Sequence, residues 1–146
     1  MQANPLLKPL AELVGEWATH GSHPMLPGRT LHGRTTFEWL ESGAFLLARM
    51  HIVAPEFPDG IAIFGTDDTK PNAGRMMYFD VRNVSREYEW ILSGNIWIWM
   101  RNHPTFSQRM HLTIADDRQS IVSRGEMSRD GAAWGQDLQL TYTRTR

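Results

Sequence analysis

The sequence predicts an all-β protein, a single up-and-down antiparallel β-barrel of about ten strands with one short helix at its N-terminus. Three observations predict it. Segments of alternating apolar and polar residues follow one another along most of the 146 residues. Short turn sequences separate them, so consecutive strands are expected to be antiparallel neighbours. No second helical pattern of any length interrupts the series, and closure into a barrel would remove the exposed edges of so long a meander.

The helix is expected near the N-terminus, where Pro9 occupies a position that a first helical turn tolerates. Apolar residues recur there at helical spacing and end near Gly15; they are Leu6, Leu10, Leu13 and Val14. From that point only strand patterns follow.

About ten segments carry the strand pattern. They span residues 16–21, 30–40, 44–53, 60–66, 75–82, 86–92, 96–101, 105–115, 120–128 and 133–145. Turn chemistry separates them at 41–43, 67–72, 93–95, 116–117 and 129–131. The longest connections, 22–29 and 66–74, are expected at the barrel ends, where loops control access to an interior. No repeat of fixed length appears, which argues against a propeller or solenoid.

The composition excludes several classes of function. The chain has 16 acidic and 15 basic residues spread along its length, with a net charge of -1. No basic cluster is present to bind nucleic acid or an anionic membrane surface. The sequence has no cysteine, which excludes disulfides, thiolate metal sites and thiol nucleophiles. A chain of this length buries a sizeable core as one domain, so residues 1–146 are expected to form one.

Targeting and membrane-spanning patterns are also missing from the sequence. The apolar N-terminal stretch is interrupted, so no signal-peptide core is expected, by Pro5, Lys8, Pro9 and Glu12. The longest apolar runs, such as 44–48, are far shorter than the ~20 residues that cross a bilayer. Together with the lack of cysteine, these features predict a soluble, cytoplasmic protein.

Residues 86–109 combine aromatic rings and guanidinium groups on the predicted inner faces of three strands. Alternation places there Arg86, Tyr88, Trp90 and Leu92, then Trp97, Trp99 and Arg101, then Phe106, Gln108 and Met110. A packed core rarely accepts arginine, because a guanidinium removed from water needs a partner. A lined cavity explains this mixture. A β-bulge in 97–101 would instead turn the two tryptophans outward, where they would indicate an oligomer interface and thus a possible homodimer.

Two short motifs at opposite ends of the chain carry a resemblance to known proteins. Gly15-Glu16-Trp17 opens the first strand and Tyr142-Thr143-Arg144 closes the last. This looks like the calycin pattern of lipocalins and fatty-acid-binding proteins, in which the Trp of a Gly-x-Trp motif packs on an Arg of the final strand.

Longer segments resemble a family of small bacterial domains of unknown function with a lipocalin-like barrel. These segments are 33–41, 43–46, 57–60, 78–82, 106–109 and 134–144. That family has no established activity, so the resemblance implies the fold and leaves function open. Gly125 stands where the family pattern has Trp, which is expected to enlarge or reshape the cavity.

The resemblance to fatty-acid-binding proteins also suggests how a ligand would be held. In those proteins an Arg and a Tyr inside the barrel hold a carboxylate, and the pair Tyr142 and Arg144 is similar in kind. The alternative is that Arg144 only stacks on Trp17 and closes one barrel end. Both alternatives follow from the same motif.

Glu38 and Asp80 are the candidates for acid–base chemistry. Alternation places Glu38 on the face opposite its aromatic neighbours, although it would point inward if those rings packed outside. A carboxyl near aromatic walls would have a raised pKa. The same two carboxyls are also possible internal partners for Arg86 and Arg101. No nucleophile elbow, phosphate loop or dinucleotide fingerprint supports a reaction class, so the sequence does not predict an enzyme.

Haem chemistry is an alternative from another class. Nitrobindins are ten-stranded barrels of similar size with a haem-ligating His in the C-terminal region, and residues 15–21 match their opening motif in part. No histidine follows His111, so an iron ligand would come from His51 or His103. The sequence therefore predicts no cofactor.

A metal site would require three imidazoles from the first hairpin to converge with a carboxylate. The residues concerned are His20, His23 and His32, with Glu38 or Asp59. Spacing in a loop rich in Gly and Pro fixes no geometry, so no metal is predicted.

We therefore expect the barrel to bind a small amphipathic or hydrophobic molecule reversibly, with Arg, Tyr and Gln orienting a polar or acidic head group. A barrel filled by its own side chains, serving a structural or self-associating role, is the other alternative. Methionines in the predicted strands either fill the core or offer a permissive surface. The expected ligand-binding residues are Glu38, Arg86, Tyr88, Trp90, Trp97, Trp99, Arg101, Phe106, Gln108, Tyr142 and Arg144.

Overall fold

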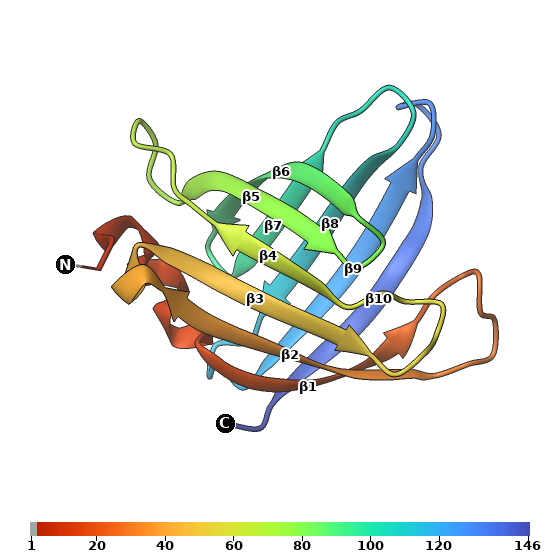
Figure 1. Ribbon diagram of the computed structural model, residues 1–146, viewed down its shortest axis with the longest axis horizontal. Coiled ribbons are helices and arrows are strands. Elements are labelled where there is room, and N and C mark those ends of the chain that lie inside the picture. Colours follow the sequence, from red (N-terminus) through yellow and green to blue (C-terminus); the bar gives the residue numbers. More distant parts are fainter. Residues whose placement is uncertain (1–2) are drawn as a thin grey trace.

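The computed structural model describes residues 3–146 and shows a closed barrel of ten antiparallel strands (Figure 1). It confirms the predicted all-β barrel with a short N-terminal helix. Two 3-10 helices accompany the strands, η1 (Pro5–Leu13) and η2 (Glu41–Gly43). The strands are β1 (Gly15–Ser22), β2 (Leu31–Leu40), β3 (Phe45–Ile52), β4 (Gly60–Phe64), β5 (Ala73–Asp80), β6 (Val84–Ser93), β7 (Ile96–Arg101), β8 (Ser107–Ile114), β9 (Ser120–Ser128) and β10 (Gly135–Arg144).

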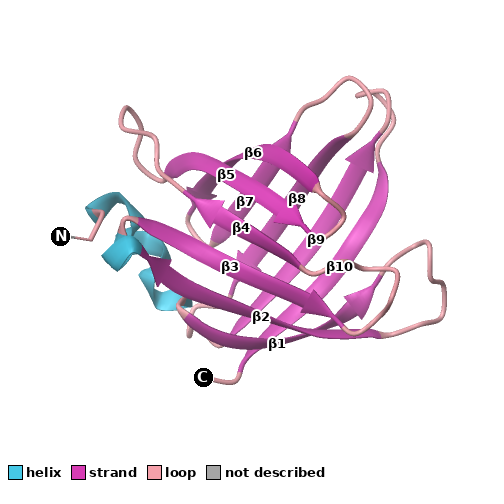
Figure 2. Cartoon of the chain, viewed as in Figure 1, coloured by secondary structure: helices cyan, strands magenta, loops and turns pink. Residues whose placement is uncertain are grey.

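Each strand pairs with its neighbours in the chain, and β10 pairs with β1 to close the sheet. In this last pairing Trp17 stands opposite Arg144. Closure removes the unpaired strand edges that an open sheet would expose. Both helices lie at one end of the barrel (Figure 2), where the backbone N–H of Asn4 donates to the Gly43 carbonyl at 2.9 Å. This end is called the closed end below.

The N-terminal helix differs from an α-helix in the residues that it buries. Leu7, Leu10 and Leu13 are 0%, 0% and 1% exposed, whereas Leu6 is 38% exposed. A 3-10 helix has three residues per turn, so leucines three apart share one face, and this face packs onto the closed end. Within residues 3–146 neither helix has the length and apolarity needed to cross a membrane.

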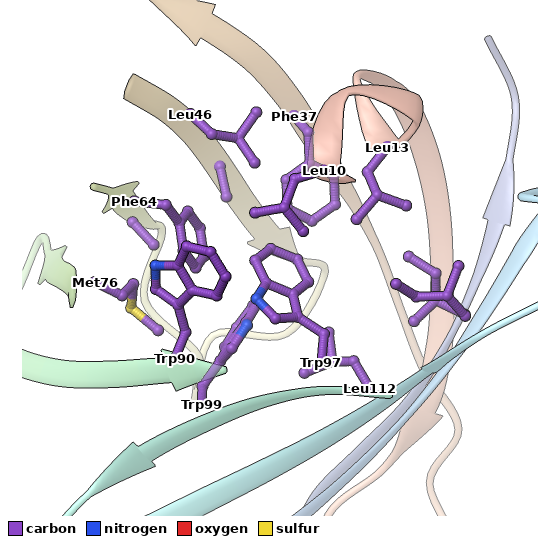
Figure 3. Close-up of a cluster of buried hydrophobic side chains, with 14 of the residues drawn as sticks. Leu10, Leu13, Phe37, Leu46, Phe64, Met76, Trp90, Trp97, Trp99 and Leu112 are labelled. Carbon is purple, nitrogen blue, oxygen red and sulfur yellow. The ribbon is translucent and has the colours of Figure 1, made fainter. Parts of the chain in front are cut away.

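Aromatic side chains fill the barrel next to this helix (Figure 3). Trp97 is 0% exposed, and its ring centre lies 4.8 Å from that of Phe64 and 5.0 Å from that of Trp99. Trp90 meets Trp97 edge to face and donates its indole N–H to the Gly65 carbonyl at 2.8 Å. The rings face inward because the register between β6 and β7 is unbroken. Their burial removes the reason to place an oligomer interface on Trp97 and Trp99.

Strand β10 contains a β-bulge that changes which side chains face the interior. Its pairing with β9 shifts between Gln136 and Gln139. Gly125 of β9 lies opposite, and a Cβ atom there would come within 2.6 Å of the Leu138 carbonyl oxygen. Glycine therefore allows the bulged backbone to approach this closely. As a result, the consecutive residues Asp137 and Leu138 both line the interior.

Candidate functional site

A cavity of about 440 Å³ occupies the barrel half away from the closed end. Residues of the loops following β1, β3, β5, β7 and β9 line its mouth. Strands β5 to β10 supply most of its walls. The side chains that line it are His23, Met25, Met50, Ile52, Glu56, Phe57, Pro58, Met76, Tyr78, Arg82, Arg86, Tyr88, Trp99, Phe106, Gln108, Met110, Met127, Arg129, Asp137 and Leu138, together with Gly60. The barrel is thus filled at one end and hollow at the other.

Five of the residues predicted to bind a ligand line this cavity: Arg86, Tyr88, Trp99, Phe106 and Gln108. They come from β6, β7, β8 and the residue before β8. Alternation within these strands brings them to one interior face, because their pairing has no shift in register.

Other predicted ligand-binding residues lie near the cavity without lining it. Trp90 and Trp97 belong to the packed cluster at the closed end. Arg101 donates to the Phe106 carbonyl at 2.6 Å and so holds the segment that carries the Phe106 ring. Trp90, Trp97 and Arg101 therefore support the cavity wall without forming its surface.

Tyr142 and Arg144 are at the closed end. Tyr142 is 3% exposed, and burial raises the pKa of its phenol to about 12. Arg144 lies over the ring of Trp17 and donates to backbone carbonyls near the N-terminal helix. Arg144 therefore stacks on Trp17 and closes the barrel end, which is the second of the two alternatives that its motif offered.

Glu38 lies on the outside of the barrel. Its carboxylate pairs with Arg49 at 2.5 Å, and its side chain is 47% exposed. The preceding residue, Phe37, is 1% exposed, so strict alternation along β2 turns Glu38 outward. The expectation that Glu38 contributes to the interior is therefore not met.

Asp80, at the cavity rim, forms hydrogen bonds with neighbouring side chains. Arg82 donates to its carboxylate at 2.8 Å, and the Tyr78 hydroxyl donates to it at 2.8 Å. The hydrogen bond from Arg82 is the main cause that lowers the pKa of Asp80 to about 2. Burial and the bond to Asp80 raise the pKa of Tyr78. We call Tyr78, Asp80 and Arg82 the ionic group at the cavity rim. Because Arg82 pairs with its carboxylate, Asp80 is not a partner for Arg86.

Arg86 lies in the cavity with its guanidinium carbon 5.0 Å from the centre of the Phe106 ring. Among residues 3–146, no carboxylate lies within 4.0 Å of this guanidinium. Arg129, at the mouth, has no such partner in the described chain either. The acidic residues on the cavity wall are engaged elsewhere, Glu56 by Arg29 at 2.7 Å. The guanidinium groups of Arg86 and Arg129 are therefore not paired directly with a carboxylate of the described residues.

A chain of hydrogen bonds crosses the cavity wall from β6 to β10. The Tyr88 hydroxyl donates to the Gln108 side-chain carbonyl. The Gln108 amide donates to Asp137 at 2.9 Å, and Asp137 contacts the imidazole of His23 at 2.9 Å. Burial raises the pKa of Tyr88, whereas the nearby Arg86 lowers it. We call these four residues the polar chain.

Sequence reasoning did not place two members of the polar chain, Asp137 and His23, in the cavity, and it considered His23 only as a metal ligand. Counting back from Tyr142 by alternation places Asp137 outside, and only the bulge turns it inward. His23 lies 114 residues from Asp137 and belongs to a loop, so no local pattern connects the two. The glycine at position 125, inside a strand, is the one signal of a bulge that the sequence contains.

Methionine side chains form a large part of the apolar wall: Met50, Met76, Met110 and Met127, with Met25 at the mouth. The thioether side chain is flexible and polarisable, so it adapts to ligands of different shape. Met76, at 2% exposure, also belongs to the packed core, and Met50 and Met110 pack against it.

Of the three histidines considered for a metal site, His20 and His32 stand opposite each other on β1 and β2, whereas His23 lies on the cavity wall. His51 pairs with Asp59 outside the barrel, and His103 lies in an exposed loop against Thr105. The cavity wall contains one histidine, His23, and hydrogen bonds engage both of its ring nitrogens. Residues 3–146 contain no group of three His, Asp or Glu side chains placed to hold a metal ion. Neither of the two histidines considered for iron, His51 and His103, lies on the cavity wall.

Comparison with known proteins supports the fold. No family model matches the chain, and no curated protein matches it either. The structure is similar to the crystal structure of Rv2717c from M. tuberculosis, with a TM-score of 0.70 and 14% sequence identity over 99% of this chain and 100% of that chain. At this identity the likeness concerns the fold alone, which is consistent with a calycin-like barrel. The similarity to nitrobindins and fatty-acid-binding proteins stays a prediction.

Proposed function

We propose that the barrel binds a small amphipathic molecule reversibly, with an acidic head group beside Arg86 and an apolar part against the aromatic and methionine wall. Burial of the apolar part would contribute ~25 cal/mol for each Å² removed from water, before the cost of ordering the ligand. The cavity volume of about 440 Å³ is within the range of sites that bind small molecules.

The observation that carries this proposal is the unpaired guanidinium of Arg86 inside the cavity. A cation that is partly removed from water is costly unless an anion or other acceptors meet it. The ring of Phe106 meets one face of the group, and the Tyr88 hydroxyl oxygen beside it is a neutral acceptor that does not balance its charge. A ligand carboxylate would accept two parallel hydrogen bonds from a guanidinium.

Calorimetric titration with dodecanoate tests the proposal. We expect one site per chain, and we expect Arg86→Gln to weaken binding about tenfold or more, because a charge-assisted hydrogen bond is lost. Arg124→Gln is the matched control, since it removes the same charge from an exposed position on β9. Equal affinities for the two variants would contradict the role of Arg86, and the absence of any heat of binding would contradict the proposed function.

A further inference from the structure

The directions of the hydrogen bonds in the polar chain follow from its chemistry. The Met25 backbone N–H donates to His23 Nδ1 at 3.0 Å, so the ring proton of a neutral imidazole is on Nε2 and is donated to Asp137. The Gln108 amide donates to the other oxygen of this carboxylate. The Gln108 carbonyl oxygen is then the group that accepts the Tyr88 proton. Each bond has only one direction.

This arrangement leaves unused acceptors on the cavity wall. Each Asp137 oxygen accepts one hydrogen bond from the polar chain, whereas an ionised carboxylate has about four acceptor sites in all. The proton of Tyr88 is donated to Gln108, and its oxygen accepts a hydrogen bond from the neighbouring Arg86. The second N–H of Gln108 is the remaining donor of the polar chain. Asp137 is 7% exposed, so bulk water has little access to it.

The cavity wall thus carries two charged groups of opposite character. Arg86, next to Tyr88 on the inner face of β6, offers donors only, while Asp137 on β10 offers acceptors only. A simple carboxylate would satisfy Arg86 but would bring a second negative charge toward Asp137 without supplying a donor to it. A ligand with a donor group beside its anion would satisfy both Arg86 and Asp137.

We propose that the ligand is an amphipathic acid that also carries a hydrogen-bond donor near its carboxylate, such as a hydroxy acid, and that Asp137 recognises this donor. The inference rests on the proposed function, because it assigns the acidic group of the ligand to Arg86. It goes further in assigning specificity to a side chain buried in the polar chain. The bulge opposite Gly125 is the element that positions it.

Calorimetric titration of the intact protein with 3-hydroxydodecanoate and with dodecanoate tests this inference. We expect the hydroxy acid to bind about tenfold more tightly or better, since a hydrogen bond to a charged acceptor is gained. In Asp137→Asn the preference is expected to fall to about threefold or less, because the amide is a neutral and weaker acceptor. Glu87→Gln, an equal charge change on the outer face of β6, is expected to keep the preference of the native chain.

The possible outcomes separate the two proposals. If neither acid binds, the proposed function fails and takes the inference with it. If both acids bind the native protein with equal affinity, the proposed function stands and the recognition by Asp137 is overturned. A preference that survives in a folded Asp137→Asn protein would likewise overturn it. The comparison of the two acids on the native chain does not depend on the stability of any variant.

Discussion

The guanidinium carbon of Arg144 lies 4.3 Å from the centre of the Trp17 ring. The same side chain donates to the Arg118 carbonyl at 3.0 Å and to the Val14 carbonyl at 3.1 Å, and it also reaches the Glu12 carbonyl. Trp17 belongs to the first strand and Arg144 to the last, so one guanidinium connects both ends of the sheet with the end of the N-terminal helix. The contacts make Arg144 a structural residue of the closed end.

Replacing Arg144 with Lys is therefore expected to destabilise the fold and to leave ligand binding unchanged. An ammonium group cannot stack as a plane on the indole or serve three carbonyls in a fixed fork. We expect a loss of about 1–3 kcal/mol in the free energy of unfolding, measured by urea denaturation. Arg124→Lys is the control at an exposed site. A change in dodecanoate affinity without a loss of stability would instead assign Arg144 to the binding site.

The bulge in β10 gives a second prediction. In Gly125→Ala the new Cβ atom would lie 2.6 Å from the Leu138 carbonyl oxygen and 2.9 Å from the Met110 sulfur. The β10 backbone has to move, so we expect a loss of about 1–3 kcal/mol in stability and weaker binding of dodecanoate. In Gly135→Ala, the control at the start of β10, the added atom meets nothing within 4 Å. Equal stability of the two variants would show that the bulge relaxes without cost.

The ionic group at the cavity rim predicts a dependence of stability on pH. Hydrogen bonds from Arg82 and Tyr78 lower the pKa of Asp80 from 3.8 to about 2. A carboxyl whose pKa is lower in the folded state stabilises the fold above the unfolded pKa, and this contribution is lost as the pH falls through the folded pKa. Solvent screening reduces the effect, because the Arg82 side chain is 54% exposed.

We therefore expect the native protein to exceed Asp80→Asn in unfolding free energy by about 1–2 kcal/mol at pH 5, and by less at pH 2. Urea denaturation at both pH values measures the difference. Asp68→Asn, at an exposed position outside this group, serves as the control. A difference that stays constant between the two pH values would show that the carboxyl contributes through packing alone.

The sequence predicts correctly which side chains face the interior where the strands are regular. The prediction fails where a strand contains a bulge. Trp97, Trp99 and Arg86 lie on the inner face because alternation in β6 and β7 continues without interruption. Asp137 escapes prediction because one bulge reverses the alternation in β10. The same reasoning explains Glu38, where regular alternation in β2 places the carboxylate outside.

Contacts between distant loops and strands are also beyond the reach of sequence patterns. The pairing of His23 with Asp137 depends on the path of the loop after β1, which no periodicity records. Whether Arg144 closes the barrel end or contacts a ligand depends likewise on which backbone carbonyls the closed barrel brings within its reach. In both cases the residue type indicates a need for a partner, and only the fold supplies it.

The two buried tryptophans of β7 give a last prediction, since only Trp99 of the indoles in the described chain lines the cavity. Trp97 is enclosed at 0% exposure by rings that include Phe64. A bound ligand would change the surroundings of the Trp99 indole and leave the surroundings of the Trp97 indole unchanged. We expect dodecanoate to alter the intrinsic fluorescence of the native protein and of Trp97→Phe. In Trp99→Phe most of this signal is expected to vanish.

Calorimetry separates a lost signal from lost binding in this pair of variants. Because phenylalanine keeps an aromatic ring at the cavity floor, dodecanoate is expected to bind Trp99→Phe within about tenfold of its native affinity, as one smaller apolar contact is worth about 1 kcal/mol. Trp97→Phe is expected to lower the unfolding free energy by about 1–3 kcal/mol without changing affinity, because it opens space inside the packed cluster. A fluorescence change that persists in Trp99→Phe and disappears in Trp97→Phe would place the ligand at the closed end instead, against the proposed site.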